Sequence, residues 1–227
     1  SAAVMQQFEK DGINVLTDHR LTRFLNSNGV KSMEAEHHGE TVTVEFDEVL
    51  LAIGRKPNTE GFGLEELDMP LTPSGTIEIN NAMQTAYPNI FACGDVAGPY
   101  QFTHMASFQA YFAALNSLLG GIWQMKANYR VVPWATFTDP EVARVGLSEQ
   151  EAKDRNIPYE ITRYELDHHD RALADGEAHG FVKVLTVPGK DKILGVTILG
   201  YHAGELIGEF VFAMTHGMGL TKISAVT

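Results

Sequence analysis

The stretch NIFACGDVAGPYQFTHMASFQAYFAALNSLL, residues 89–119, decides the fold of the first half of this sequence. Its opening run, Asn89 to Cys93, is almost entirely apolar, which is typical of a strand buried on both faces, and it stops at Gly94. Residues 103–119 contain no proline or glycine and carry apolar groups on almost every side. They therefore predict a buried helix that Gly120-Gly121 ends.

The pair Gly94-Asp95 follows the predicted strand directly. Glycine allows a ligand to approach the backbone, and a carboxylate accepts hydrogen bonds from the hydroxyls of a sugar or sugar alcohol. Ligands of open α/β sheets bind beyond the carboxyl ends of strands, which is the position of this pair. A tight turn with a solvated carboxylate explains the same two residues equally well.

A second apolar run meets a glycine earlier in the chain, in LLAIGRKPN, residues 50–58. Asp47 to Ile53 predicts another strand buried on both sides. Gly54 would let a dinucleotide pack against the chain, and Arg55 could bind a phosphate or a carboxylate. A plain structural turn is an equally good interpretation.

The residues before this run predict a short helix over 2–11, ended by Gly12, and a small β-rich run at 13–16. Residues 21–25, 30–36 and 41–46 predict strands, because turn residues separate them at Asn28-Gly29 and His38-Gly39. We expect an antiparallel meander with one solvated face. A short strand is predicted at 76–79.

After Asn128 the chain alternates between strand and helix patterns. Strands are predicted in VPWATF, VARVGL, YEITRYEL, FVKVLTV and KILGVTIL, helices at 149–155 and 203–218, and a hairpin loop at 188–191. The predicted fold is therefore α/β in the first half, comprising parts of two dinucleotide-binding domains, followed by an α+β domain built on an antiparallel sheet. The boundary is placed near residue 129.

The 227 residues are 44% hydrophobic and 20% charged, enough for a sizeable core. A formal charge of -12 would repel nucleic acid and anionic membranes, so neither is an expected partner. No run of eighteen apolar residues or signal peptide is recognisable. The one cysteine excludes an internal disulfide and favours the reducing cytoplasm.

Nine histidines are present, including the pairs His37-His38 and His168-His169. Adjacent strand residues point to opposite faces, so neither pair is a natural two-ligand metal site, and we expect no metal. Glu205 and Glu209 lie on one helical face, where a solvated surface is a commoner explanation than an acid-base couple. Residues 167–171, DHHDR, predict a polar loop.

The order and separation of LLAIGRKPN, ACGDV and FTHMASFQA resemble the pyridine nucleotide disulfide oxidoreductases, nearest the dihydrolipoamide dehydrogenase and mercuric reductase branch. The resemblance covers essentially the whole chain. It implies that residues 1–56 end an NAD(P)-binding domain, 57–128 end a FAD-binding domain, and 129–227 form an interface or dimerisation domain. The segments 132–146 and 200–217 are similar to parts of that last domain.

The resemblance also implies site residues and partners. Asp95 would accept the ribityl hydroxyls of FAD, Gly94 would allow the approach, and the backbone of residues Phe102, Thr103, His104 and Ala106 would line the isoalloxazine. Gly54 and Arg55 would contact NAD or NADP, and Gln109 would lie near the nicotinamide face. The implied reaction passes a hydride from NAD(P)H to FAD and on to a small-molecule or protein disulfide, in a homodimer.

Parts of the family's catalytic equipment are missing from the sequence. There is no GxGxxG and no Cys-x4-Cys, and the His-Pro-Thr tail of the family would follow Thr227. We therefore expect a C-terminal half without catalytic residues of its own, inactive in isolation. Two alternatives stay open: a dimerisation module that binds no cofactor, and an unrelated ligand-binding domain with a chance Gly-Asp.

Overall fold

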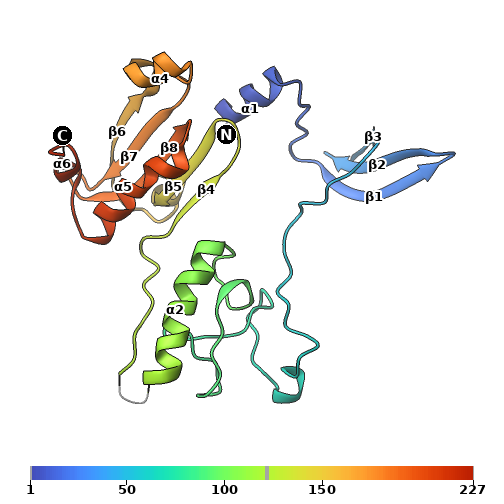
Figure 1. The fold of residues 1–227 in the computed structure, drawn as a ribbon. Coiled ribbons are helices and arrows are strands. Elements are labelled where there is room, and N and C mark those ends of the chain that lie inside the picture. The colour runs from blue at the N-terminus through green and yellow to red at the C-terminus, as the bar shows by residue number, and fades with distance from the viewer. Residues whose placement is uncertain (1, 121–122, 227) are drawn as a thin grey trace. The chain divides into compact units, whose positions relative to one another are not determined.

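The computed structural model describes residues 2–120 and 123–226, which form two compact units (Figure 1). The first unit ends at Arg55 and the second begins at Lys56. The domain boundaries expected at residues 56 and 128 stay predictions.

The first unit contains a helix and a three-stranded antiparallel sheet. Helix α1 spans Ala2–Lys10, and β1 (Arg20–Ser27), β2 (Val30–His37) and β3 (Glu40–Glu45) pair in that order. Asn28 and Gly29 have φ of 53° and 88°, and His38 and Gly39 have 50° and 86°. Two consecutive left-handed residues match the twist of the flanking strands, and both predicted hairpins are confirmed. The predicted helix is confirmed by α1.

The predicted strand at residues 47–53 is wrong, as is the β-rich run at 13–16. Leu50 is 89% exposed and Ile53 is 83% exposed, so this apolar run is uncovered. A strand needs a neighbour that pairs with its backbone groups, and within the described residues none pairs with 47–53. The sequence pattern shows that these residues are apolar, but it does not show whether a neighbouring strand is available to pair with them.

The second unit opens with an irregular segment that holds two short 3₁₀ turns, η1 (Glu65–Leu67) and η2 (Gly94–Val96). The strands predicted at 76–79 and 89–93 are wrong, because only isolated bridges form there, Leu71 with Ile77 and Gln84 with Phe91. Single backbone hydrogen bonds hold this segment, such as that from the Ala92 N–H to the Met83 carbonyl at 3.0 Å. A side chain adds to them: the Asn80 carboxamide oxygen accepts from the N–H groups of Ala82 and Gln84 at 2.8 and 3.2 Å. A small core of Met69, Ile77, Ala92 and Ala97 lies beneath.

Helix α2 spans Thr103–Leu119, as predicted, and Gly120 caps it; Gly121 lies outside the described residues. The prediction that this helix is buried is wrong for most of its surface, since only Met105, Gln109 and Asn116 are buried and Leu118 is 80% exposed. Asn116 connects the buried face of α2 to the neighbouring loops by hydrogen bonds. Its amide donates to the carbonyls of Ala82 and Met125 at 2.9 and 2.8 Å.

A five-stranded antiparallel sheet of order β4-β5-β8-β7-β6 follows. Its strands are β4 (Pro133–Thr136), β5 (Glu141–Gly146), β6 (Glu160–Glu165), β7 (Phe181–Thr186) and β8 (Ile193–Gly200), which confirms the strand predictions for this part. Helix α5 (Ala203–Thr215) lies across the sheet in Figure 1. Its Ala203 and Ile207 enter a core that includes Val145, Val196 and Ile198.

Three further helices complete the second unit: α3 (Glu149–Asp154), α4 (Asp170–Asp175) and α6 (Leu220–Ile223). The polar loop predicted at 167–171 is wrong, because these residues form the turn η3 (Leu166–His168) and the start of α4. The Leu206 side chain of α5 is 50% exposed. In the part of the chain that is described, no helix is long and apolar enough to cross a membrane.

Candidate functional site

The candidate site is built where η2 packs against the first turns of α2. Gly94 has a φ of 79°, a conformation that side chains rarely adopt. A Cβ at this position would stand 3.2 Å from the Cβ of Ala106, so the backbone conformation favours glycine and the contact leaves little room for a side chain. The close approach places the half-buried Asp95, which follows Gly94, beside the beginning of α2.

Gln109 holds η2 in this position from inside. The side chain is completely buried, and its oxygen accepts a hydrogen bond from the Gly94 N–H at 2.6 Å. Its amide nitrogen donates to the Gly98 carbonyl at 2.6 Å and to the Tyr129 hydroxyl at 3.0 Å. The carboxamide is therefore engaged within the chain at both ends, and its expected nicotinamide contact stays a prediction.

The N-terminus of α2 has no side-chain cap. Phe102 is extended there, and its carbonyl accepts from the Ala106 N–H at 2.9 Å, which begins the helix. The first turn contains no acidic residue. The N–H groups of this turn therefore present a partial positive charge that could stabilise an anionic group.

The rings of Phe102 and His104 connect this turn to the sheet. They stack at 5.4 Å with an interplanar angle of 8°, and Phe102 also stacks on Trp134 of β4 at 6.3 Å. The Nε2 atom of His104 lies 2.9 Å from the carbonyl oxygen of Pro133. Because the imidazole is bound to the backbone of β4, the main chain of residues 102–106 is the better candidate for ligand contact.

Gly54 and Arg55 belong to the first unit, whereas Asp95 belongs to the second. Gly54 has a φ of 134°, and a Cβ there would meet nothing within 4 Å. The backbone conformation at residue 54 therefore favours glycine, although a side chain there would meet no neighbouring atom. A nucleotide contact at these two residues stays a prediction.

Sequence reasoning missed Tyr129. Its hydroxyl lies 3.7 Å from the Met83 sulfur in addition to its bond with Gln109, so it joins three distant segments. No local pattern marks it, because all of its partners are 20 or more residues away. Among the described residues, no group of three or more His, Cys, Asp or Glu could hold a metal ion.

The chain is similar in sequence to dihydrolipoyl dehydrogenases. Curated relatives include the dihydrolipoyl dehydrogenase of Chlamydia pneumoniae, 34% identical over 98% of this chain and 47% of the relative, and the human mitochondrial dihydrolipoyl dehydrogenase, 35% identical over 86% and 38%. The chain thus spans about half the length, or less, of the relatives it matches.

Solved structures show the same fold over the whole chain. The HOCl-induced flavoprotein disulfide reductase RclA from Escherichia coli superposes with a TM-score of 0.87 at 20% identity, covering 100% of this chain and 51% of that one. LpdA from Mycobacterium tuberculosis gives 0.87 at 22% identity, with coverages of 100% and 48%. These likenesses confirm the predicted fold class.

Two family descriptions match the sequence directly. Residues 1–110 match "Pyridine nucleotide-disulphide oxidoreductase", and residues 132–226 match "Pyridine nucleotide-disulphide oxidoreductase, dimerisation domain". The two matches leave little of the chain uncovered and occur in the order that the resemblance of the motifs predicted. This chain belongs to the pyridine nucleotide-disulphide oxidoreductase family.

Proposed function

We propose that this chain supplies the part of a FAD-dependent oxidoreductase that binds the ribityl chain and the pyrimidine end of the flavin. The parent reaction would pass a hydride from NAD(P)H to FAD and then two electrons to a disulfide or a similar acceptor. The observation that carries the proposal is the contact between η2 and α2, which places an acceptor carboxylate next to an uncapped helix N-terminus.

The chemistry of these groups fits FAD. The carboxylate of Asp95 can accept hydrogen bonds from hydroxyls, and Gly94 allows the close approach of η2 to Ala106 of α2. The first-turn N–H groups of Thr103 and His104 would stabilise negative charge at the pyrimidine end. When bound, FAD would supply the two-electron chemistry, and the residues of this chain would orient it and favour its anionic form.

Gln109 acts in this proposal as a positioning residue. Its oxygen fixes the N–H of Gly94 and its nitrogen fixes the carbonyl of Gly98, so it sets the course of the loop that carries Asp95. Ala106 sets the distance between that loop and the helix. Gly54 and Arg55 would contact NAD or NADP, as the family resemblance implies.

The parent protein would be a homodimer, because residues 132–226 match a dimerisation domain. Half-exposed apolar side chains of α5, Leu206 at 50% and Phe212 at 58%, support a partner surface on this domain. The single cysteine favours a reducing compartment such as the cytoplasm.

A second candidate applies to the isolated chain, which would behave as a dimerisation module that binds no cofactor. The match to the dimerisation domain favours it. Purified chain mixed with FAD and passed through a desalting column should be colourless. A stoichiometric flavin absorbance band would contradict this part of the proposal.

The flavin site itself is tested by joining the chain to the N-terminal half of the dihydrolipoyl dehydrogenase of Geobacillus stearothermophilus, a relative 33% identical over 99% of this chain. We expect the chimera to retain FAD, and the Asp95→Ala variant to lose most of it. Asp167→Ala is the control, since Asp167 is exposed and remote from η2 in sequence. Equal flavin content in the Asp95→Ala and Asp167→Ala proteins would refute the role of Asp95.

A further inference from the structure

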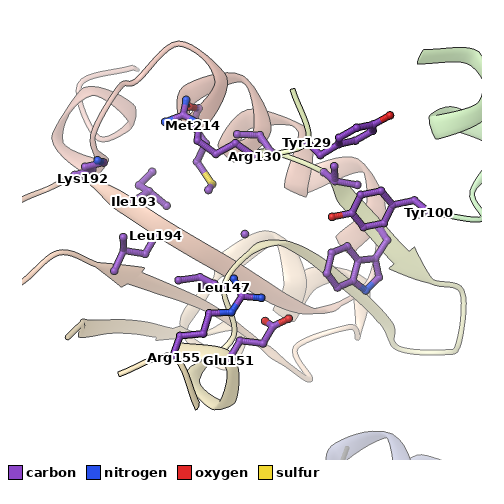
Figure 2. A pocket seen from close by; sticks show the side chains of 14 residues that line it. Tyr100, Tyr129, Arg130, Leu147, Glu151, Arg155, Lys192, Ile193, Leu194 and Met214 are labelled. Atoms are coloured by element: carbon purple, nitrogen blue, oxygen red, sulfur yellow. The ribbon is translucent and has the colours of Figure 1, made fainter. Parts of the chain in front are cut away.

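A cavity of about 460 Å³ lies within the second unit, lined by residues outside η2 and the first turn of α2. Its wall comes from the segment 129–134, the end of β5, helix α3, the beginning of β8 and Met214 of α5 (Figure 2). The volume is in the range of small-molecule sites in proteins. Neither the family match nor the proposed flavin site accounts for it.

The side chains that line this cavity are mainly positive, whereas the net charge of the chain is negative. Arg130, Arg155 and Lys192 line it, together with a single carboxylate, Glu151, although the whole sequence carries a formal charge of -12. Glu151 is already paired, since its Oε2 lies 2.5 Å from the Nη2 of Arg144 and accepts from the Ser148 N–H at 2.7 Å. In the described part of the chain, none of the three lining cations has an ion-pair partner.

One of these cations is hydrogen-bonded to the main chain. The Nη2 of Arg130 donates to the carbonyl of Met214 at 3.1 Å, which leaves its other N–H groups for a ligand. Figure 2 shows Arg130 and Arg155 on opposite sides of the cavity, with Lys192 at one end. Positive groups therefore surround the cavity from three directions.

The other end of the cavity is aromatic. Tyr100 and Tyr129 lie there in Figure 2, with ring centroids 5.8 Å apart, and Trp134 also lines the wall. The guanidinium of Arg144 lies 4.8 Å from the centroid of the Trp134 ring, which holds the indole in place from behind. Half-buried aromatic rings offer flat surfaces on which a planar ring can stack.

From this combination we propose that the cavity binds a small aromatic carboxylate. The ring stacks against Tyr100, Tyr129 and Trp134, and the carboxylate points to Arg130, Arg155 and Lys192. A planar guanidinium can bind a carboxylate through two parallel hydrogen bonds.

The cavity adjoins the proposed flavin site, because the Tyr129 hydroxyl accepts from Gln109, and Tyr100 and Trp134 stack on Phe102. Arg155 and Lys192 line the cavity and belong to neither η2 nor α2, so their variants test the cavity without altering the flavin site.

The test uses 2-naphthoate as the probe and the fluorescence of Trp134 as the signal. The sequence has two tryptophans, so the variant Trp123→Phe leaves Trp134 as the only one. Trp123 is 61% exposed and is absent from the cavity lining, so this variant should fold normally. Saturable quenching by 2-naphthoate is expected, and titration calorimetry on the unmodified chain gives an independent affinity.

The charge requirement separates this site from general apolar adsorption. The neutral analogue 2-naphthalenemethanol should bind about tenfold more weakly or worse, and Arg155→Gln and Lys192→Gln should each weaken 2-naphthoate about fivefold. Lys153→Gln is the matched control, because Lys153 lies on α3 but does not line the cavity. It should change the affinity less than twofold.

Two results would overturn the proposal. One is equal affinity for 2-naphthoate and 2-naphthalenemethanol, and the other is an affinity for 2-naphthoate that Arg155→Gln and Lys192→Gln leave unchanged. Unfolding curves from circular dichroism show whether each variant is folded, so a loss of binding can be assigned to the cavity.

Discussion

Replacing Gln109 by alanine should destabilise the second unit by about 3 kcal/mol. The substitution removes the acceptor of the Gly94 N–H at 2.6 Å and the donor to the Gly98 carbonyl at 2.6 Å. Both glycines are buried, so water does not readily replace the lost partners. A buried polar group left without a partner costs about 1–3 kcal/mol, and two such groups give the expected total.

Urea unfolding followed by tryptophan fluorescence measures this loss, because Trp123 and Trp134 both lie in the second unit. Gln109→Met separates hydrogen bonding from volume, since methionine fills similar space but has no amide. We expect it to lose nearly as much stability as Gln109→Ala. Leu118→Ala, at an 80% exposed position of the same helix, should cost less than about 0.5 kcal/mol. Full stability in Gln109→Met would refute the hydrogen-bond reasoning.

Two further changes test the packing and the electrostatics of the second unit. Gly94→Ala should lower the free energy of unfolding by about 2 kcal/mol, measured by thermal unfolding, and by more than Gly75→Ala does. Both positions have positive φ, but only at Gly94 would a Cβ stand 3.2 Å from another Cβ. Equal losses of stability in the two variants would contradict the Ala106 contact. The hydrogen bond from Lys183 at 2.5 Å lowers the pKa of Glu149 below its usual value. The ionised carboxylate therefore stabilises the fold at pH values above the ordinary glutamate pKa. This stabilisation is lost as the pH falls through the lowered pKa. Glu149→Gln should therefore cost about 0.5–1 kcal/mol at pH 7 and nothing near pH 2 in urea titrations; a cost independent of pH would exclude the ion pair as its cause.

The α+β part of the fold could be predicted strand by strand, because each strand there finds its partners within the same stretch of chain. The β5 and β7 segments each pair with β8, and apolar residues of the three strands form one core with α5. The predicted end of α5 at Met218 was late, since Gly217 has a φ of 68° that a helix does not continue through. Hairpins in the first unit were predictable for the same local reason.

The failures share a different cause. Residues 47–53 and 89–93 have the apolar pattern of buried strands, yet pairing depends on a second strand that the pattern does not specify. The candidate site shows the same limit. Gly94 and Asp95 are recognisable as a motif, but the role of Gln109 arises from contacts with Gly94, Gly98 and Tyr129, which are 11 to 20 residues away from it.

The uncovered run at residues 49–53, VLLAI, has a consequence for how this chain behaves at high concentration. It combines strong β-propensity with an absence of charge and proline, and its Leu50 is 89% exposed. Such segments from different molecules can stack edge to edge into intermolecular sheets, which is the first step of fibril growth. The formal charge of -12 opposes that association at low ionic strength, and salt screens the repulsion. Colloidal stability of the chain is therefore a balance between five apolar residues and the net charge of the whole molecule.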